Sequence, residues 1–209
     1  MKFKSRNEAG TLLAEQLKSY ANNKDVIVLA LPRGGVPVAY PVAKQLKAPM
    51  DLCLVKKLGV PFQEELAMGA IAMNGEPVLN EEIILHGGIS YEDLQEIITQ
   101  KQAENNARNK LYRHDKPAPN VKNKIVIIID DGIATGATMR AAIVSLKMQQ
   151  PKKVIIGIPV ADKSICNELR ELADEVVCLF QPESLIAVGI WYENFDQTTD
   201  EEVIDLIKR

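Results

Sequence analysis

Short apolar runs punctuate this chain, and segments with helical spacing separate them. Each run is a few residues long and rich in valine, isoleucine and leucine, which is typical of strands that are buried on both faces of a parallel sheet. The runs cover residues 26–31, 51–55, 126–129, 154–160, 176–180 and 185–190. They predict the strands of a mostly parallel sheet.

Between the runs, apolar residues recur three or four positions apart, which predicts amphipathic helices. Side chains that can cap a helix stand where these helices would begin: Ser5, Asn80, Ser90, Asp162 and either Thr198 or Thr199. The alternation of strand and helix predicts an α/β fold with a doubly wound, mostly parallel sheet. In such a sheet, ligands bind beyond the carboxyl ends of the strands, where the strand order reverses.

The middle of the chain departs from this alternation. Residues 67–73 and 77–79 flank Asn74-Gly75, which predicts a β-hairpin, whereas residues 56–66 contain Gly59 and Pro61 and predict a loop. A long helix is expected from residue 90 to about residue 112. It has few apolar residues in its second half, so we expect it on the surface or over another element.

Composition narrows the class of protein without naming a function. The 209 residues are 46% apolar and 25% charged, which suits one domain with a small appendage. A net charge of −3 without a Lys/Arg-rich block argues against a nucleic-acid partner. No signal peptide or membrane-length apolar stretch is evident, so we expect a cytoplasmic protein without a membrane partner. The widely spaced Cys53, Cys166 and Cys178 favour inert buried thiols over a disulfide framework or a zinc site.

The strongest chemical signal is the segment from Val126 to Thr138, which reads VIIIDDGIATGAT. A loop of small residues that leads into a helix N-terminus binds anions, because the unpaired helix amides and the helix dipole both face the loop. Asp130 and Asp131 would repel a phosphate but can accept hydrogen bonds from hydroxyl groups or face a metal-bound ligand. The segment therefore predicts a site for a ribose 5-phosphate. The alternative is an ordinary buried strand followed by a solvated turn.

This segment resembles the signature with which type I phosphoribosyltransferases bind phosphoribosyl diphosphate (PRPP). The resemblance implies that Asp130 and Asp131 hold the ribose 2- and 3-hydroxyls. It also implies that the 5-phosphate is cradled by Ala134, Thr135, Gly136, Ala137 and Thr138. The implied cofactor is Mg²⁺, held largely by PRPP itself, with help from the two aspartates.

Two further segments take implied roles from the same resemblance. Arg33, Gly34 and Gly35 follow the first strand, where the family binds the pyrophosphate of PRPP and often has a cis non-proline peptide. Residues 56–66 match the family's mobile loop. There, Lys56 or Lys57 would neutralise the departing pyrophosphate, and Glu64 or Glu65 would take a proton from the nucleophile. The alternative for this second segment is an ordinary charged surface loop.

The acceptor is expected to contact the late stretch that contains Val188, Trp191 and Tyr192, where 6-oxopurine enzymes of the family contact the base. The alternative is strand core with aromatic packing. Ala161 stands near the place of a lysine that reads the purine oxygen in those enzymes, and Ala134 replaces an acid proposed as a general base. Both departures argue against a 6-oxopurine acceptor.

The chain as a whole is similar to a bacterial group of type I phosphoribosyltransferases with a helical insertion. The resemblance implies a core of residues 1–79 and 116–209 and a helical hood of residues 80–115 over the site. It implies a PRPP-dependent pentosyltransferase of nucleotide metabolism that acts on a nitrogen nucleophile, such as a nucleobase or related heterocycle, and a homodimer. A sensor of PRPP or nucleotides, or a binding protein without transferase activity, is the alternative.

Overall fold

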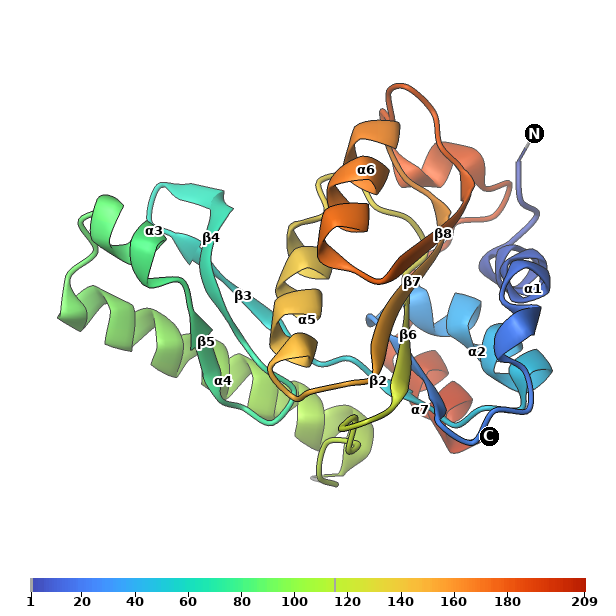
Figure 1. The fold of residues 1–209 in the computed structure, drawn as a ribbon, viewed down its shortest axis with the longest axis horizontal. Coiled ribbons are helices and arrows are strands. Elements are labelled where there is room, and N and C mark those ends of the chain that lie inside the picture. The colour runs from blue at the N-terminus through green and yellow to red at the C-terminus, as the bar shows by residue number, and fades with distance from the viewer. Residues whose placement is uncertain (1, 115) are drawn as a thin grey trace. The chain divides into compact units, whose positions relative to one another are not determined.

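The computed structural model describes residues 2–114 and 116–209, except for the side chains of Glu64 and Glu65 (Figure 1). The described chain divides into two compact units. The first unit comprises Met1–Cys53, Val121–Gly136 and Gln150–Arg209, and the second comprises Leu54–Asn120 and Ala137–Gln149.

A five-stranded parallel sheet forms the centre of the first unit, with the strand order β2-β1-β6-β7-β8. Its strands are β1 (Val26–Ala30), β2 (Met50–Leu52), β6 (Ile125–Ile129), β7 (Lys153–Val160) and β8 (Glu175–Phe180). Every residue of β1 and β6 is buried, as expected for strands that are covered on both faces. The predicted α/β fold with a parallel sheet is confirmed.

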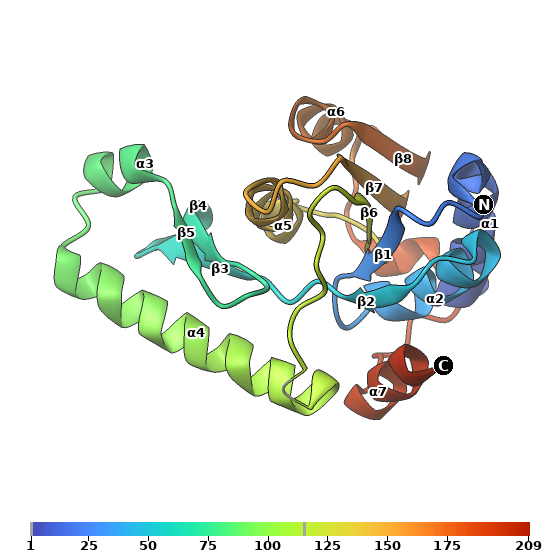
Figure 2. The same cartoon turned by 60° about the horizontal axis from the view of Figure 1, so that its bottom comes forward.

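Helices cover both faces of this sheet (Figures 1 and 2). On one side lie α1 (Arg6–Gln16), α2 (Gly35–Leu46) and α7 (Asp200–Lys208), and on the other lies α6 (Lys163–Leu172). The predicted caps Ser5 and Asp162 accept hydrogen bonds from backbone amides at the starts of α1 and α6. Thr199, and not Thr198, caps α7.

The strand order places a reversal between β1 and β6. From β1 the chain continues outward to β2 on one side, and from β6 it continues outward to β7 and β8 on the other. The loops that leave the carboxyl ends of β1 and β6 therefore depart in opposite directions. A crevice between such loops is the usual ligand position in an open α/β sheet.

An antiparallel sheet and three helices make up the second unit. Its strands are β3 (Lys56–Val60), β4 (Gln63–Ile71) and β5 (Pro77–Leu79), and its helices are α3 (Glu81–His86), α4 (Tyr91–Arg113) and α5 (Ala137–Lys147). Leu58, Met68 and Ile71 of the sheet share a core with Leu94 and Ile98 of α4. The predicted hairpin around Asn74-Gly75 and the caps Asn80 and Ser90 are all present. No helix in the described part of the chain is long and apolar enough to cross a membrane.

Three local predictions are wrong. Residues 56–66 are not a loop: β3 and the start of β4 form a hairpin whose turn contains Phe62 at φ +65°, because the alternating Leu58 and Val60 are buried against the unit's core. Residues 185–190 do not form a strand, since β8 is the last strand of the sheet and the chain turns into a 3₁₀ helix (η2, Val188–Trp191). The second strand ends at Leu52 and not at residue 55.

Close contact between α1 and α2 depends on Gly10. A Cβ atom at this position would lie 2.2 Å from the carbonyl oxygen of Val38 and 2.6 Å from Cγ of Pro41. A methyl group at residue 10 would therefore push the two helices apart.

We expect Gly10→Ala to lower the free energy of unfolding by about 1–3 kcal/mol, because the overpacking outweighs the better helix propensity of alanine. Thr11→Ala, at the exposed neighbouring position, should change stability by less than about 0.5 kcal/mol. Urea unfolding of the two variants tests this. Equal or greater stability of Gly10→Ala would contradict the close packing.

Candidate functional site

The two predicted donor loops meet at the reversal of the strand order in the first unit. Asp130 and Asp131 follow β6 directly, and Arg33 follows β1 after a cis peptide bond between Pro32 and Arg33. The amide of Leu31 donates a 2.9 Å hydrogen bond to the carbonyl oxygen of Ile129, so the parallel pairing of β1 and β6 continues to the ends of both strands.

Glycines allow the two loops to approach each other. A Cβ at Gly34 would lie 2.0 Å from Oδ2 of Asp131, and a Cβ at Gly35 would lie 2.6 Å from the carbonyl oxygen of Ile129. A side chain at residue 34 would displace the Asp131 carboxylate, and a side chain at residue 35 would displace the backbone at the end of β6. The Gly34-Gly35 pair is therefore required by the packing of this site.

The Asp131 side chain and its backbone are held separately. Its Oδ2 accepts a 2.8 Å hydrogen bond from Nε of Arg6, and these side chains are 15% and 11% exposed, respectively. Its carbonyl oxygen accepts a 2.6 Å hydrogen bond from the hydroxyl of Tyr192. The Asp131 amide donates to Oδ1 of Asp130 at 2.9 Å, which links the two acids.

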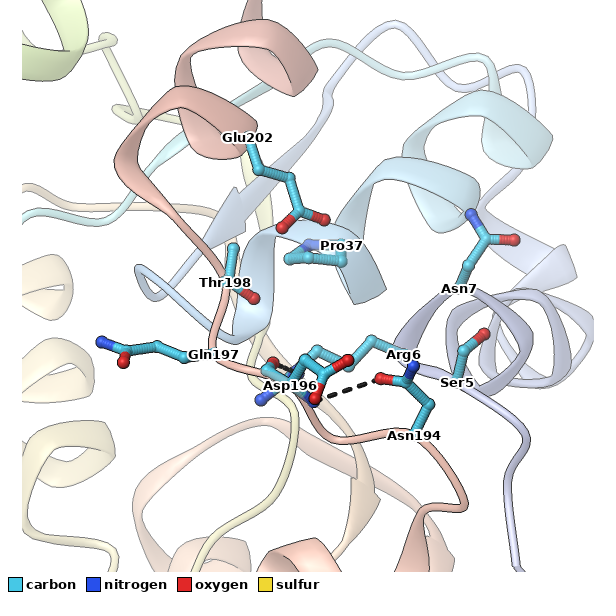
Figure 3. Close-up of a pocket in the computed structure, with 9 residues that line it drawn as sticks. All are labelled: Ser5, Arg6, Asn7, Pro37, Asn194, Asp196, Gln197, Thr198 and Glu202. Carbon is cyan, nitrogen blue, oxygen red and sulfur yellow. Dashed lines mark hydrogen bonds between the residues drawn. The ribbon is translucent and has the colours of Figure 1, made fainter.

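Arg6 has further contacts that fix its guanidinium. Its Nη1 donates a 2.7 Å hydrogen bond to the carbonyl oxygen of Asp196, and its Cζ lies 3.9 Å from the centre of the Phe195 ring, within cation–π range. Arg6 also lines a pocket of about 190 Å³ (Figure 3). The residues that line it come from α1, α2, α7 and the segment before α7: Ser5, Arg6, Asn7, Pro37, Asn194, Asp196, Gln197, Thr198 and Glu202.

Burial and mutual repulsion govern the electrostatics of the acids. Burial of the carboxyl group, followed by the charge of Asp131, raises the pKa of Asp130 well above its ordinary value, although Arg6 opposes this shift. Burial, with a smaller contribution from Asp130, raises the pKa of the Cys53 thiol to about 12. Burial and the charge of Asp131 also raise the pKa of Tyr192, so its hydroxyl stays protonated as a donor.

The turn after the acids is anchored to the end of β7. Ile133 forms a parallel bridge with Ala161, and its amide donates a 3.0 Å hydrogen bond to the carbonyl oxygen of Val160. Ala134 and Thr135 are exposed, and Gly136 has φ +73°, a left-handed conformation that favours glycine. Ala137 and Thr138 then open α5, so the predicted order of turn and helix N-terminus is present.

Arg33 lies at the exposed end of its loop. Its Nη1 is 3.6 Å from Oδ1 of Asp200 in the first turn of α7, and the two side chains are 35% and 38% exposed. An exposed ion pair of this length contributes little to stability. The guanidinium can therefore exchange its carboxylate partner for a diphosphate at small cost.

The residues of the stretch that is expected to contact the acceptor differ in their surroundings. Trp191 stacks on Phe180 with ring centres 5.5 Å apart, while Tyr192 is 3% exposed and holds Asp131. Val188 packs on the acidic turn at Gly132. A Cβ at Gly132 would lie 2.4 Å from Cγ1 of Val188. Ile186 and Ile190, beside Val188 in the sequence, are 87% and 49% exposed.

The lysines assigned to the catalytic loop lie on β3 in the second unit. Nζ of Lys56 donates a 2.8 Å hydrogen bond to Glu104 of α4, and Lys101 donates to the same carboxylate at 2.8 Å. These two lysines lower the pKa of Glu104 to about 2. Lys57 is half-buried. The side chains of Glu64 and Glu65 lie outside the described residues.

A metal ion could use only a small set of protein ligands here. Among residues 2–114 and 116–209, with the side chains of Glu64 and Glu65 left aside, no group of three or more histidine, cysteine, aspartate or glutamate side chains could hold one. Asp130 and Asp131 offer the oxygen ligands that Mg²⁺ prefers, but Arg6 already engages one of the four carboxylate oxygens. The two aspartates could therefore supply only part of the ligands of a magnesium ion.

Sequence reasoning missed Arg6, Phe195 and Asp196 as parts of this site. Arg6 is 125 residues away from Asp131 in the chain, so no local pattern connects them. The sequence did contain one signal that sets Arg6 apart. Arg6 is the first residue of α1, next to the positive end of the helix dipole, where acidic side chains are preferred.

Residues 4–192 match the family described as the phosphoribosyl transferase domain. The chain is 41% identical over 207 residues to a Mycobacterium tuberculosis H37Rv protein named "Putative phosphoribosyl transferase Rv0571c". That alignment covers 99% of this chain and 46% of the relative, so the chain spans about half the length of the curated relatives it matches. The family match confirms the resemblance seen in the sequence.

Solved structures agree in fold. The crystal structure of TT1426 from Thermus thermophilus has a TM-score of 0.91 at 36% identity, with 99% of this chain and 98% of that chain covered. The AQ2163 protein from Aquifex aeolicus has a TM-score of 0.53 at 15% identity, with coverage of 88% and 78%, which is a likeness in fold alone.

Replacement of each aspartate by asparagine should change the free energy of unfolding, in opposite directions for Asp130 and Asp131. Asp130→Asn removes a charge that burial disfavours, so we expect a gain of about 1 kcal/mol near pH 8. Asp131→Asn leaves Arg6, whose side chain is 11% exposed, without its carboxylate, so we expect a loss of about 2 kcal/mol.

The gain from Asp130→Asn should depend on pH. Because its pKa is higher in the folded than in the unfolded chain, the folded wild type binds more protons between the two pKa values and loses stability as pH rises through that window. The gain should therefore shrink as pH falls towards about 4, the ordinary value for an aspartate. Thermal unfolding of the variant and the wild type from about pH 8 to about pH 4 measures this gain in stability. A gain that stays unchanged over the whole range would contradict the burial of an ionised Asp130.

Proposed function

The chain belongs to the phosphoribosyl transferase family, and from this premise we propose that it transfers the 5-phosphoribosyl group of PRPP to a nitrogen nucleophile. The observation that carries the proposal is the meeting of three elements at the carboxyl ends of β1 and β6. These are a pair of carboxylates, a glycine loop with an arginine, and a small-residue turn that opens a helix. The carboxylates match the ribose hydroxyls of PRPP, the glycine loop with its arginine matches the diphosphate, and the small-residue turn matches the 5-phosphate.

In this proposal, each chemical group of the donor has a protein partner. Asp130 and Asp131 accept hydrogen bonds from the ribose 2- and 3-hydroxyls. Arg33 and the backbone amides of Gly34 and Gly35 bind the diphosphate. Residues 134–138 bind the 5-phosphate with backbone amides and the hydroxyls of Thr135 and Thr138.

Mg²⁺ bound with PRPP would neutralise part of the diphosphate charge, which favours its departure. The protein's own task is to orient the ribose so that C1 faces the acceptor. The acceptor nitrogen then forms a bond to C1 while the bond from C1 to the diphosphate oxygen breaks. Pyrophosphate leaves with the bonding electrons, the configuration at C1 is inverted, and the nitrogen loses its proton to a base.

We propose a planar heterocycle as the acceptor. Val188 contacts the acidic turn, and the exposed Ile186 and Ile190 extend this apolar stretch. An apolar surface beside a ribose site suits the face of a ring. Trp191 and Tyr192 are then supports of the site, since Trp191 packs on Phe180 and Tyr192 on Asp131. Ala161 is buried and offers no lysine for a 6-oxopurine oxygen.

The assignments in the second unit extend the proposal. Residues 80–115 would serve as the hood, residues 1–79 and 116–209 as the core, and residues 56–66 as the counterpart of the family's mobile loop. Lys56 or Lys57 would neutralise the pyrophosphate, and Lys56 is paired with Glu104 in this structure. Glu64 or Glu65 would accept the proton. A cytoplasmic homodimer is the assembly we propose.

Release of pyrophosphate from PRPP in the presence of Mg²⁺ and a panel of nucleobases, related heterocycles and small amines tests the activity. We expect acceptor-dependent release by the wild type. The double variant Asp130→Asn with Asp131→Asn should lose PRPP binding by at least about 100-fold, because each lost carboxylate removes a charge-assisted hydrogen bond.

The folded state of the double variant is checked by circular dichroism and thermal unfolding. PRPP binding by the wild type without pyrophosphate release for any acceptor would favour the alternative of a sensor or binding protein. Wild-type PRPP affinity in a folded double variant would contradict the donor site.

A further inference from the structure

We propose that Arg6 is a positioning residue of the donor site, which holds the Asp131 carboxylate in the orientation that receives the ribose hydroxyls. This inference rests on the proposed function and adds to it a residue from the start of the chain. Nε of Arg6 lies 2.8 Å from Oδ2 of Asp131. Arg6 also contacts a backbone oxygen and a ring, and Asp131 is the carboxylate with which it forms its ion pair.

The position of the guanidinium is determined from three directions. Asp131 binds Nε, the Asp196 carbonyl oxygen binds Nη1 at 2.7 Å, and the Phe195 ring covers the guanidinium at 3.9 Å. Phe195 is itself stacked on Tyr192, with ring centres 5.0 Å apart. Tyr192 in turn holds the backbone of Asp131. The side chain and the backbone of Asp131 are thus fixed through one connected set of contacts.

Helix stability does not explain an arginine at this place. Residue 6 is the first residue of α1, where the partial positive charge of the helix N-terminus disfavours a cation. Its side chain is 11% exposed, so burial adds a desolvation cost. The carboxylate of Asp131 and the Phe195 ring offset these costs, which ties the arginine to the acidic turn.

Orientation matters for a carboxylate that must receive a hydroxyl group. A side chain that is free to rotate would lose affinity for the ribose, and a misplacement of about 1 Å can cost about 100-fold in activity. Asp131 lies against Gly34, where a Cβ would be 2.0 Å from its Oδ2. Loss of Arg6 would therefore allow the carboxylate to leave the loop that is proposed to bind the diphosphate.

The test compares Arg6→Met, Arg6→Lys and Ser5→Ala with the wild type. Methionine fills much of the same space without charge, and lysine keeps the charge but not the planar group that binds Asp131 and Asp196 together. Ser5→Ala is the matched control, because it removes the cap of the same helix without touching Asp131. Calorimetry gives the dissociation constant of PRPP with Mg²⁺, thermal unfolding gives stability, and pyrophosphate release gives KM and kcat.

We expect Arg6→Met to raise the dissociation constant and the KM for PRPP by about ten-fold or more, while kcat changes by less than about three-fold. Arg6→Lys should recover part of the affinity. Ser5→Ala should unfold at a lower temperature and keep wild-type PRPP affinity. If Arg6→Met does not fold, Arg6→Lys decides, with an expected rise of about three-fold or more in the dissociation constant.

Three results would overturn the inference, and only the last of them would also remove the proposed function. Wild-type PRPP affinity in a folded Arg6→Met variant, or in Arg6→Lys if that variant decides, would show that Arg6 serves stability alone and would leave the proposed function intact. An equal loss of PRPP affinity in Ser5→Ala would also show that Arg6 serves stability alone. Failure of the wild type itself to bind PRPP would remove the proposed function, and the Arg6 inference with it.

Discussion

Two adjacent carboxylates at the end of a fully buried strand are the constraint on which the rest of the first unit depends. Burial and the neighbouring charge of Asp131 both disfavour the ionised form of Asp130. The surrounding structure compensates in specific ways. Arg6 supplies a positive charge, Tyr192 binds the backbone, and the Asp131 amide donates to Asp130.

The topology of the sheet explains why the compensating groups come from distant parts of the chain. With the order β2-β1-β6-β7-β8, the loops after β1 and β6 meet beside the central pair of strands. Glycine at residues 34 and 35 lets them approach. The start of α1 and the segment before α7 then provide Arg6, Phe195 and Asp196. Residues near both ends of the sequence thus support a turn in its middle.

The sequence allowed good prediction where the physical cause is local. Caps at Ser5, Asn80 and Asp162 satisfy helix amides within three residues, and the run at residues 126–129 signals a buried strand by itself. The hairpin at residues 56–66 was missed because Gly59 and Pro61 suggested a loop, whereas Gly59 lies at an irregularity in the pairing of β3 and β4. The strand expected at residues 185–190 is absent because the sheet already ends at β8, which nothing local in the sequence shows.

The candidate site was partly predictable for the same reason. Asp130, Asp131 and the small-residue turn form one contiguous segment, so their chemistry is visible in the sequence. The cis peptide at Arg33 was implied only by the family resemblance, and the ion pair of Arg6 depends on residues 125 positions apart. Packing brings such groups together, and a single sequence does not encode that packing in a local pattern.

The central claim is that the acidic pair receives the ribose of PRPP. A crystal structure of the chain with PRPP and Mg²⁺ tests it most directly. We expect the ribose 2- and 3-hydroxyls at about 2.6–3.2 Å from carboxylate oxygens of Asp130 and Asp131, with the diphosphate at Arg33, Gly34 and Gly35. PRPP bound with its hydroxyls turned away from both carboxylates, or bound elsewhere on the chain, would contradict it.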